Sequence, residues 1–359
     1  MQGHREGMSG RVVNREDFIP DEVWVTGDDG FFLVPLRRSE DPEGWLALVR
    51  SDQAITTQVD DGRDKYDGKG IIPTSSCSAR WVVDRMLDLL GVRPGMRVLE
   101  IGTGTGYNAA LLAVQAGSGQ VTSMEVDPMI AGQARAALDR TGHPVRVIAG
   151  DGTAGYPAGA PYDRVIATAS VSVVPCSWVE QTRPGGRIVF PFAGTFDGAL
   201  AVLVVDDDGV ARGRFHDEAG FMRLRNQRRD PHVWWLGEDD ADVRPTRRYL
   251  REPFDDAATG FAVGLWLPGC TTGDIDEGGP ANTLLLSHSP SQSWASLTAG
   301  LDEHEITQYG PRRLWDELET AYDWWMNSGR PSRDRFGLTV TPDGQTFWLD
   351  NPDHAILLR

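Results

Sequence analysis

Short apolar runs alternate with stretches of helical spacing between residues 97 and 192, and this pattern limits the fold more than any other feature. The runs have the length of buried strands, and most of them are followed by a helical stretch. Strands that alternate with helices form βα units and therefore a parallel sheet. The expected strands lie at 97–102, 121–126, 145–150, 163–169 and 187–192, and the expected helices at 79–90, 106–116, 128–141 and 175–182. The sequence thus predicts an open α/β domain.

The turn after the first of these strands, in LEIGTGTGY, holds glycines at alternate positions: Gly102, Gly104 and Gly106. A strand, a glycine-rich turn and a helix together bring backbone N–H groups and a helix N terminus toward a ligand at the carboxyl edge of the sheet. The dinucleotide fingerprint GxGxxG has its third glycine one residue later, where Tyr107 stands here. This spacing weakens the hypothesis of an NAD-dependent dehydrogenase, for which no catalytic acid can be placed either.

Acidic residues lie at or near the ends of three successive expected strands. Glu100 precedes the glycines, Glu125 ends the next strand, and Asp151, followed by Gly152, comes after the third. An acid placed like Glu125 can accept both hydroxyls of a ribose, and Asp151 could reach an adenine amino group. Each acid alone could equally cap a helix or lie in a solvated loop, but three at successive strand ends are harder to obtain by chance. A GxGxG turn preceded by an acid resembles that of S-adenosylmethionine-dependent methyltransferases.

Five motifs in order, covering about residues 70–205, resemble the protein-L-isoaspartate O-methyltransferase family. They are IGTGTGYNAALLA, VTSMEVD, GDG, YDRVIATASV and RPGGRIVFP. The resemblance implies a Rossmann-like methyltransferase domain with a mostly parallel sheet, S-adenosylmethionine as methyl donor, S-adenosylhomocysteine as product and a peptide carboxylate as acceptor. The residues then expected at the cofactor are Glu100, Gly102, Thr103, Gly104, Gly106, Tyr107, Glu125, Asp151 and Gly152.

The same resemblance aligns Ser78 with an essential serine of the family. The family has a proline two residues further on, where this chain has Arg80. We expect Ser78 to orient the acceptor carboxylate and Arg80 to pair with it through a forked contact. A serine in front of a helix also serves as an N-cap, and Arg80 could instead be a surface residue on the outer face of the helix.

The remaining sequence divides the chain into three parts. Residues 1–70 give no regular pattern and form a segment that we expect to pack on the methyltransferase domain at 71–205. Residues 206–359 form a C-terminal α+β appendage and a candidate peptide-recognition domain. Within the appendage we expect strands at 261–267 and 282–288, a helix at 311–327 and a hairpin at 337–350. The neighbours Trp324 and Trp325 cannot share one helix face, so one of them lines a groove or covers the sheet.

Three stretches of the appendage resemble a subgroup of these methyltransferases that accompanies actinobacterial ribosomal-peptide biosynthesis, of lasso peptide, graspetide or lanthipeptide type. They are GFMRLR, QYGPRRLWDELETAYDWW and RFGLTVTPDGQTFWLD. This resemblance implies methylation of an aspartate side chain in a modified precursor peptide, followed by closure of the ester to an aspartimide. Two hypotheses stay open beside it: a general L-isoaspartyl repair enzyme, and a catalytically silent binding module that keeps the cofactor fold.

Composition excludes several other functions. The formal net charge of −17 argues against a nucleic acid as partner, because binding to phosphates requires cations. Ten arginines within residues 212–251 are a local exception, either a self-paired surface or a docking patch for an acidic peptide. The 3 cysteines and 7 histidines show no metal-ligand spacing, so we expect no metal. No apolar run suits a membrane span or a secretion signal, which leads us to expect a cytoplasmic protein without a membrane partner. We expect a monomer.

Overall fold

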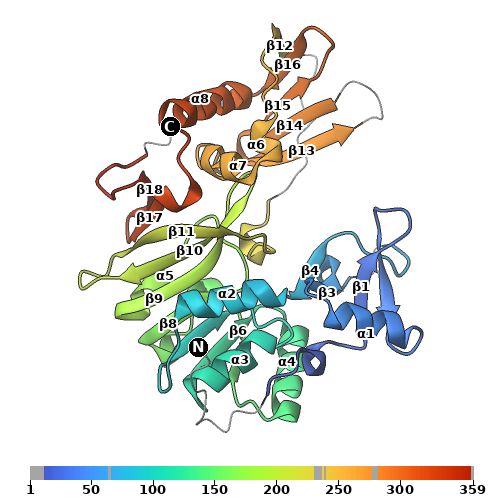
Figure 1. Cartoon of the computed structure of the whole chain (residues 1–359), viewed down its shortest axis with the longest axis vertical. Helices are drawn as coiled ribbons and strands as arrows, with labels where there is room; N and C mark the ends of the chain where they lie inside the picture. The colour runs from blue at the N-terminus through green and yellow to red at the C-terminus, as the bar shows by residue number, and fades with distance from the viewer. Residues whose placement is uncertain (1–11, 64–65, 230–236, 238–239, 277–281, 357–359) are drawn as a thin grey trace, which may run out of the picture. The chain divides into compact units, whose positions relative to one another are not determined.

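The computed structural model describes residues 12–63, 66–229, 237, 240–276 and 282–356 (Figure 1). The chain divides into two compact units. The first holds Met1–Thr168, Ser177–Val189 and Asp207–Gly209, and the second holds Ala169–Cys176, Phe190–Asp206 and Val210–Arg359. The second unit therefore draws on residues well before the position 206 at which the sequence placed the start of the appendage.

The first unit contains the parallel sheet that the sequence predicts, and the order of its strands is β9-β8-β5-β6-β7. The strands are β5 (Val98–Ile101), β6 (Val121–Glu125), β7 (Arg146–Ala149), β8 (Tyr162–Ala167) and β9 (Thr182–Ala193), the last of which ends in the second unit. The chain runs outward from β5 through β6 to β7 and then returns to β8 on the other side of β5. Ligands of open α/β sheets bind at such a reversal, outside the carboxyl ends of the strands.

The helices of this unit lie close to their predicted positions. They are α2 (Arg80–Leu90), α3 (Tyr107–Ala116), α4 (Pro128–Thr141) and the short α5 (Cys176–Glu180). The Asp127 carboxylate caps α4 by accepting hydrogen bonds from the backbone nitrogens of Met129 and Ile130. Gly142 ends this helix at a φ of 71°, a left-handed conformation that glycine adopts without steric cost.

The first unit also contains an N-terminal lobe that the sequence did not predict. It is an antiparallel sheet of order β2-β1-β3-β4 with one helix beside it (Figure 1). Its elements are β1 (Glu22–Thr26), β2 (Leu33–Arg37), α1 (Pro42–Arg50), β3 (Ile55–Val59) and β4 (Pro73–Cys77). Trp45 is fully buried at its centre and donates a hydrogen bond from Nε1 to the carbonyl oxygen of Pro20 (3.1 Å). Phe18 packs into a cluster with residues of α3 and α4, which fastens the lobe to the parallel sheet's helices.

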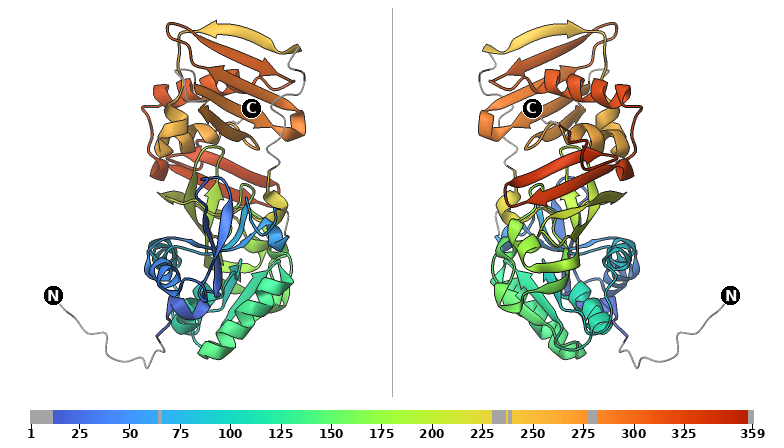
Figure 2. Two further views of the ribbon diagram at one scale, coloured as in Figure 1. Left: turned by 90° about the vertical axis from the view of Figure 1, so that its right-hand side faces the viewer. Right: turned by 90° about the vertical axis from the view of Figure 1, so that its left-hand side faces the viewer.

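The second unit is built from antiparallel strands, and it confirms the α+β prediction for the C-terminal part. One set of paired strands comprises β10 (Gly198–Val205), β11 (Ala211–Glu218), β17 (Phe336–Thr341) and β18 (Gly344–Leu349). A second sheet has the order β12-β16-β15-β14-β13. Its strands are β12 (Asp242–Thr246), β13 (Thr271–Asp276), β14 (Asn282–His288), β15 (Ser293–Thr298) and β16 (His304–Tyr309). Figure 2 shows α8 (Leu314–Asn327) lying against this sheet.

The expected strand at 261–267 is wrong, because most of this stretch belongs to helix α7 (Ala257–Gly264). The Asp256 side chain caps α7 by accepting a hydrogen bond from the backbone nitrogen of Thr259 (2.8 Å). Phe261 and its two successors in the helix are fully buried, so the run is apolar on every side and carries no helical period. The expected strand at 282–288, the helix within 311–327 and the hairpin within 337–350 are confirmed as β14, α8 and the β17–β18 pair.

Several of the arginines within residues 212–251 form ion pairs, which supports the self-paired interpretation of that stretch. The pairs are Arg212 with Asp206, Arg244 with Asp316 and Glu319, Arg248 with Asp323, and Arg251 with Asp255 and Asp274. Of the neighbouring tryptophans in α8, Trp325 is buried, and the ring of Trp324 lies tilted against the rings of Trp266 and Phe336. Trp324 thus covers other aromatic side chains.

Candidate active site

The glycine turn between β5 and α3 requires its glycines. Gly102, Gly104 and Gly106 have φ angles of 93°, 52° and 89°, a region that other residues rarely adopt. The backbone nitrogen of Gly102 donates to the carbonyl oxygen of Met124 (2.8 Å), which ties the turn to the end of β6. A Cβ on Gly106 would lie 3.3 Å from the Cγ of Leu138, so α4 packs closely against the turn.

The carboxylate of Glu125 holds the glycine turn in place. Its Oε2 accepts a hydrogen bond from the backbone nitrogen of Gly104 (2.9 Å), and its Oε1 accepts one from the backbone nitrogen of Asp127 (3.1 Å). A carboxylate offers about four acceptor positions, so these two bonds leave it able to accept ligand hydroxyls as well. Its position at the carboxyl end of β6 is the one that the sequence predicts for a ribose-binding acid.

Asp151 and Gly152 lie at the end of β7, where they were expected. The Oδ1 of Asp151 accepts a hydrogen bond from the backbone nitrogen of Thr153 (2.9 Å), so this acid also caps a short 3₁₀ turn. A Cβ on Gly152 would stand 2.4 Å from the Cγ2 of Ile101, which no ordinary side chain tolerates. Glycine at 152 therefore allows the chain after β7 to approach the end of β5.

Glu100 lies beneath the turn and is fully buried. Its Oε1 accepts a hydrogen bond from the Nδ2 of Asn108 (2.6 Å), and its Oε2 accepts one from the hydroxyl of Ser123. The Ser123 hydroxyl also lies 2.6 Å from the hydroxyl of Thr103, so these hydrogen bonds connect Glu100 to the glycine turn. Because Glu100 is fully buried and both of its oxygens accept hydrogen bonds within the protein, the geometry favours a supporting role over a direct contact with a cofactor.

Burial raises the pKa of Glu100 from 4.5 to about 7. The carboxyl group of Glu100 loses its proton near pH 4.5 in the unfolded chain but keeps it to about pH 7 in the folded protein. Between these pH values the folded state therefore binds one proton more than the unfolded state. Stability should therefore fall as the pH rises through this window, by about 3 kcal/mol relative to a Glu100→Gln variant. Urea unfolding of both proteins at pH 5 and pH 8 measures the difference. An equal pH dependence in the two proteins would show that Glu100 titrates normally.

Tyr107, at the first position of α3, is half-buried, and burial raises its pKa. Its ring centroid lies 6.0 Å from that of Phe18, so it packs against the N-terminal lobe. Thr103 is buried with its hydroxyl directed to Ser123. Both residues shape the turn through packing, and their contact with a cofactor remains a prediction.

The residues expected at the acceptor, Ser78 and Arg80, follow β4, and this strand packs against the glycine turn. A Cβ on Gly104 would lie 3.3 Å from the carbonyl oxygen of Ser76. The N-cap of α2 is Ala79 and no side chain caps the helix, so Ser78 is not the cap residue that the sequence allowed as an alternative. Arg80 is exposed at the first position of α2. Burial raises the pKa of Tyr107, and the positive charge of Arg80 partly opposes this rise. The end of β4 thus stands beside the turn, and the roles of Ser78 and Arg80 stay predictions.

Arg15 is a further residue of this site, and no pattern in the sequence indicates it. Its side chain is buried and its guanidinium donates to five backbone carbonyl oxygens. The acceptors are Val49, Ser51 and Gln53 at the end of α1, and Cys77 and Ser78 between β4 and α2. Arg15 therefore fixes the backbone of Ser78 to the N-terminal lobe.

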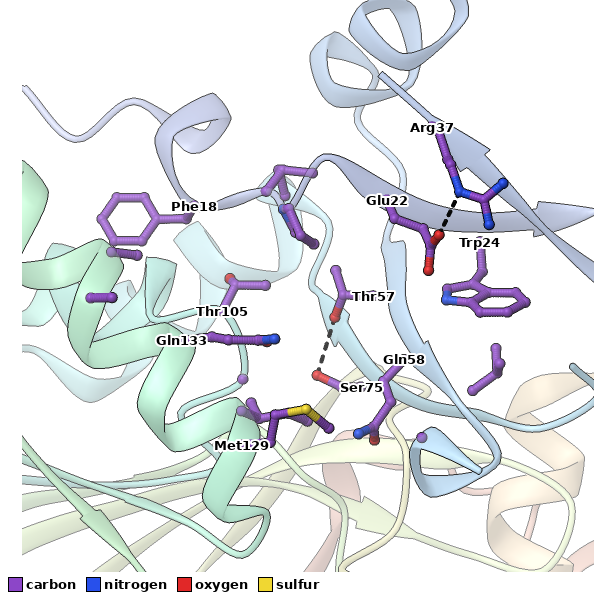
Figure 3. Close-up of a pocket in the computed structure, with 18 of the residues that line it drawn as sticks. Phe18, Glu22, Trp24, Arg37, Thr57, Gln58, Ser75, Thr105, Met129 and Gln133 are labelled. Carbon is purple, nitrogen blue, oxygen red and sulfur yellow. Dashed lines mark hydrogen bonds and ion pairs between the residues drawn. The ribbon is translucent and has the colours of Figure 1, made fainter. Parts of the chain in front are cut away.

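A pocket of about 590 Å³ lies between the N-terminal lobe, the glycine turn and α4 (Figure 3). Figure 3 shows Phe18, Trp24 and Met129 around it, with the hydroxyls of Thr57 and Ser75 3.2 Å apart on the lobe side. Gly104 and Thr105 of the glycine turn also line the pocket. The pocket could not be predicted from the sequence, because the first 70 residues show no regular pattern.

The arrangement fits S-adenosylmethionine. The turn can approach a ligand with its backbone, Glu125 stands at the end of β6 for a ribose, and Asp151 stands after the end of β7 for an adenine. In the part of the chain that the structure describes, no group of three or more His, Cys, Asp or Glu side chains is placed to hold a metal ion. Likewise, no helix among those described residues is long and apolar enough to cross a membrane.

Comparison with known proteins identifies relatives of this arrangement. The family described as protein-L-isoaspartate(D-aspartate) O-methyltransferase matches residues 65–228. The protein-L-isoaspartate O-methyltransferase of Methanopyrus kandleri is 42% identical over 150 residues, which cover 41% of this chain and 66% of that protein. Protein-L-isoaspartate O-methyltransferase 2 of Archaeoglobus fulgidus is 40% identical over 152 residues, covering 42% and 69%. The matched segment thus spans about two thirds of each relative and leaves the rest unmatched.

A solved structure described as a protein-L-isoaspartate O-methyltransferase covers 85% of this chain and 89% of its own, with a TM-score of 0.49 and 23% identity. The family match confirms S-adenosylmethionine as the cofactor that the sequence predicts. The match ends at residue 228, so most of the second unit lies outside it.

Proposed function

We propose that this chain, which belongs to the protein-L-isoaspartate O-methyltransferase family, transfers the methyl group of S-adenosylmethionine to a side-chain carboxylate of a peptide. The observation that carries the proposal is the position of Glu125, whose carboxylate binds the backbone of the glycine turn at the strand end where a ribose is expected. Ser76 of β4 contacts that turn, and Ser78 and Arg80, which follow it along the chain, supply groups suited to an acceptor carboxylate.

The reaction needs little acid–base chemistry. A carboxylate is ionised at pH 7, so its oxygen can attack the methyl carbon while the carbon–sulfur bond breaks and sulfur keeps the electron pair. The protein's task is to align the two reactants and exclude water, which can supply roughly 7–11 kcal/mol in favourable cases. We assign Ser78 to donate a hydrogen bond to the acceptor carboxylate and Arg80 to pair with it. The first turn of α2, which no side chain caps, adds backbone N–H groups that favour an anion.

For the substrate, we propose an aspartate in a modified ribosomal precursor peptide. Once methylated, the aspartyl ester has methanol as leaving group, and the backbone nitrogen of the next residue can close an aspartimide ring. Two observations support this choice. Arg80 replaces the proline of the family, and the second unit adds a large domain, most of it beyond the family match, that we propose recognises the peptide.

A second candidate is the general repair of L-isoaspartyl residues in proteins. The names of the relatives favour it, because each is a protein-L-isoaspartate O-methyltransferase. The two candidates share the cofactor site and differ only in the acceptor peptide.

Mass spectrometry distinguishes the candidates. The enzyme and S-adenosylmethionine are incubated with a linear isoaspartyl peptide or with a cyclised precursor encoded nearby. Gain of one methyl group and subsequent loss of methanol on the cyclised precursor alone supports the precursor substrate, and turnover of the linear peptide supports repair. If neither peptide is methylated although the cofactor binds, the protein is a binding module and the proposal fails.

Variants at the start of α2 test the assigned roles in the same assay. Ser78→Ala should lower kcat about 10–100-fold, since it removes one hydrogen bond to a charged group. Arg80→Ala should raise KM for the peptide about tenfold, and Arg80→Lys should restore part of the loss. Arg93→Ala, at an exposed arginine beyond α2, is the control and should leave both constants unchanged. Unaltered kinetics in Ser78→Ala would remove this residue from the mechanism.

A further inference from the structure

We infer that the pocket between the N-terminal lobe and α4 binds acidic residues of the peptide substrate that flank the methylated position. This inference rests on the proposed function and extends it, because it assigns part of the substrate recognition to the first unit. Most of the lobe precedes residue 65, where the family match begins, so about half of the residues that line the pocket lie outside the matched range.

The pocket is distinct from the place where the cofactor's nucleoside is expected. Its lining includes Gly104 and Thr105 from the glycine turn, but neither Glu125 nor Asp151. The volume of about 590 Å³ is within the range of ligand-binding pockets, so it is large enough for several atoms of a peptide beyond the reacting residue. Since the pocket begins at the turn and continues to β1 and β2, a bound chain could extend from the methyl donor across the lobe.

The charge of the lining favours an acidic occupant. Four basic side chains line the pocket, against two acidic ones, although the whole chain has a formal net charge of −17. The basic residues are Arg37, Arg63, Lys69 and Arg140, and the acidic ones are Asp17 and Glu22. A local excess of positive charge in an acidic protein attracts anionic partners and disfavours a sulfonium cation.

The basic residues differ in how far they are already neutralised. Arg37 is paired with Glu22 (2.8 Å) and with Glu40 (3.2 Å). The Nζ of Lys69, by contrast, lies 3.9 Å from the Oδ2 of Asp29, the outer limit of an ion pair. Arg63 is exposed beside the pocket. Arg140 donates a hydrogen bond to the carbonyl oxygen of Asp17 (2.6 Å). Among the residues that the structure describes, the Lys69 side chain otherwise contacts only the ring of Phe32, 5.0 Å from its Nζ, so we take Lys69 and Arg63 as the cations for a ligand carboxylate.

The floor of the pocket is apolar, which suits the hydrocarbon parts of a peptide. Met129, at the start of α4, is 58% exposed and contributes its apolar side chain to the lining. Trp24 is half-buried on the opposite wall, and Phe18 and Ile130 are buried below. Apolar walls with a few charged groups at the edge are typical of pockets that bind a ligand in one orientation.

Fluorescence anisotropy tests the inference without requiring methyl transfer. The probe is a fluorescein-labelled peptide with one isoaspartyl residue flanked by aspartates, compared with the same peptide flanked by asparagines, both in the presence of S-adenosylhomocysteine. We expect wild-type protein to bind the aspartate peptide more tightly. The double variant Arg63→Gln/Lys69→Gln should weaken that peptide's binding about tenfold, leave the asparagine peptide unchanged and keep the affinity for S-adenosylhomocysteine. Added salt should weaken the wild-type preference.

The matched control is Arg50→Gln/Arg93→Gln, which removes the same charge from exposed positions of the first unit outside the pocket. An equal loss in this control, or equal binding of both peptides by the wild type, overturns the inference. A loss of S-adenosylhomocysteine affinity in the pocket variant also overturns it, because the pocket would then belong to the cofactor. Because binding is measured separately from turnover, an enzyme that binds the peptide but does not methylate it contradicts only the proposed function.

Discussion

Replacing Glu125 by glutamine should raise the Kd for S-adenosylmethionine about 100-fold. In the folded protein both oxygens of this carboxylate accept backbone hydrogen bonds, from Gly104 and Asp127. Glutamine has one oxygen, so its amide group would face one of these N–H donors and push the turn away. It would also weaken the hydrogen bonds to the ribose, and a hydrogen bond to a charged group contributes about 1.5–3 kcal/mol. Isothermal titration calorimetry measures the change.

Asp151→Asn is the appropriate comparison for Glu125→Gln. The Oδ1 of Asp151 caps a short turn, and asparagine can keep that bond, so only the interaction with the adenine would weaken. We expect the Kd to rise about tenfold in this variant. If Glu125→Gln binds the cofactor within threefold of the wild type, the ribose is held elsewhere and the assignment of the site fails.

The sequence predicted the parallel sheet and its helices well, because the helix-capping residues and the alternation of strands with helices indicate the same boundaries. The helix expected at 128–141 begins and ends at those residues, since Asp127 caps it and Gly142 adopts the left-handed conformation after it. The glycine turn and Glu125 also lie at the strand ends where the sequence places them, because the hydrophobic pattern locates those strands.

The N-terminal lobe could not be predicted in the same way, because its short strands carry weak patterns. Strand β2, for example, has no fully buried residue, so hydrophobic alternation gives little signal. The hydrogen-bond partners of Glu100 could not be predicted for another reason. An acid in a buried strand looks like a ligand contact from sequence, but its partners Asn108 and Ser123 come from α3 and β6 and become neighbours only in the fold.

Arg15 is the clearest case of a residue that only the fold reveals, and Arg15→Ala should lower the stability of the first unit by about 3–5 kcal/mol. The substitution leaves five backbone carbonyl oxygens without the guanidinium, including those of Cys77 and Ser78, and opens a cavity in the lobe. Hydrogen exchange of the amides in α1 and β4 reports unfolding of this lobe. Arg15→Lys keeps the charge but cannot reach both groups of acceptors, so its loss should be intermediate.

The exposed Arg38 of the same lobe provides the control, because it is 49% exposed and its ion pair with Glu16 (3.4 Å) should contribute less than about 1 kcal/mol. Arg15 also bears on catalysis, since it fixes the backbone of Ser78. We therefore expect the folded fraction of Arg15→Lys to show a lower kcat with an unchanged Kd for S-adenosylmethionine. A change in the Kd with an unchanged kcat would mean that the lobe supports the cofactor and not the acceptor, and Ser78 would lose its assigned role.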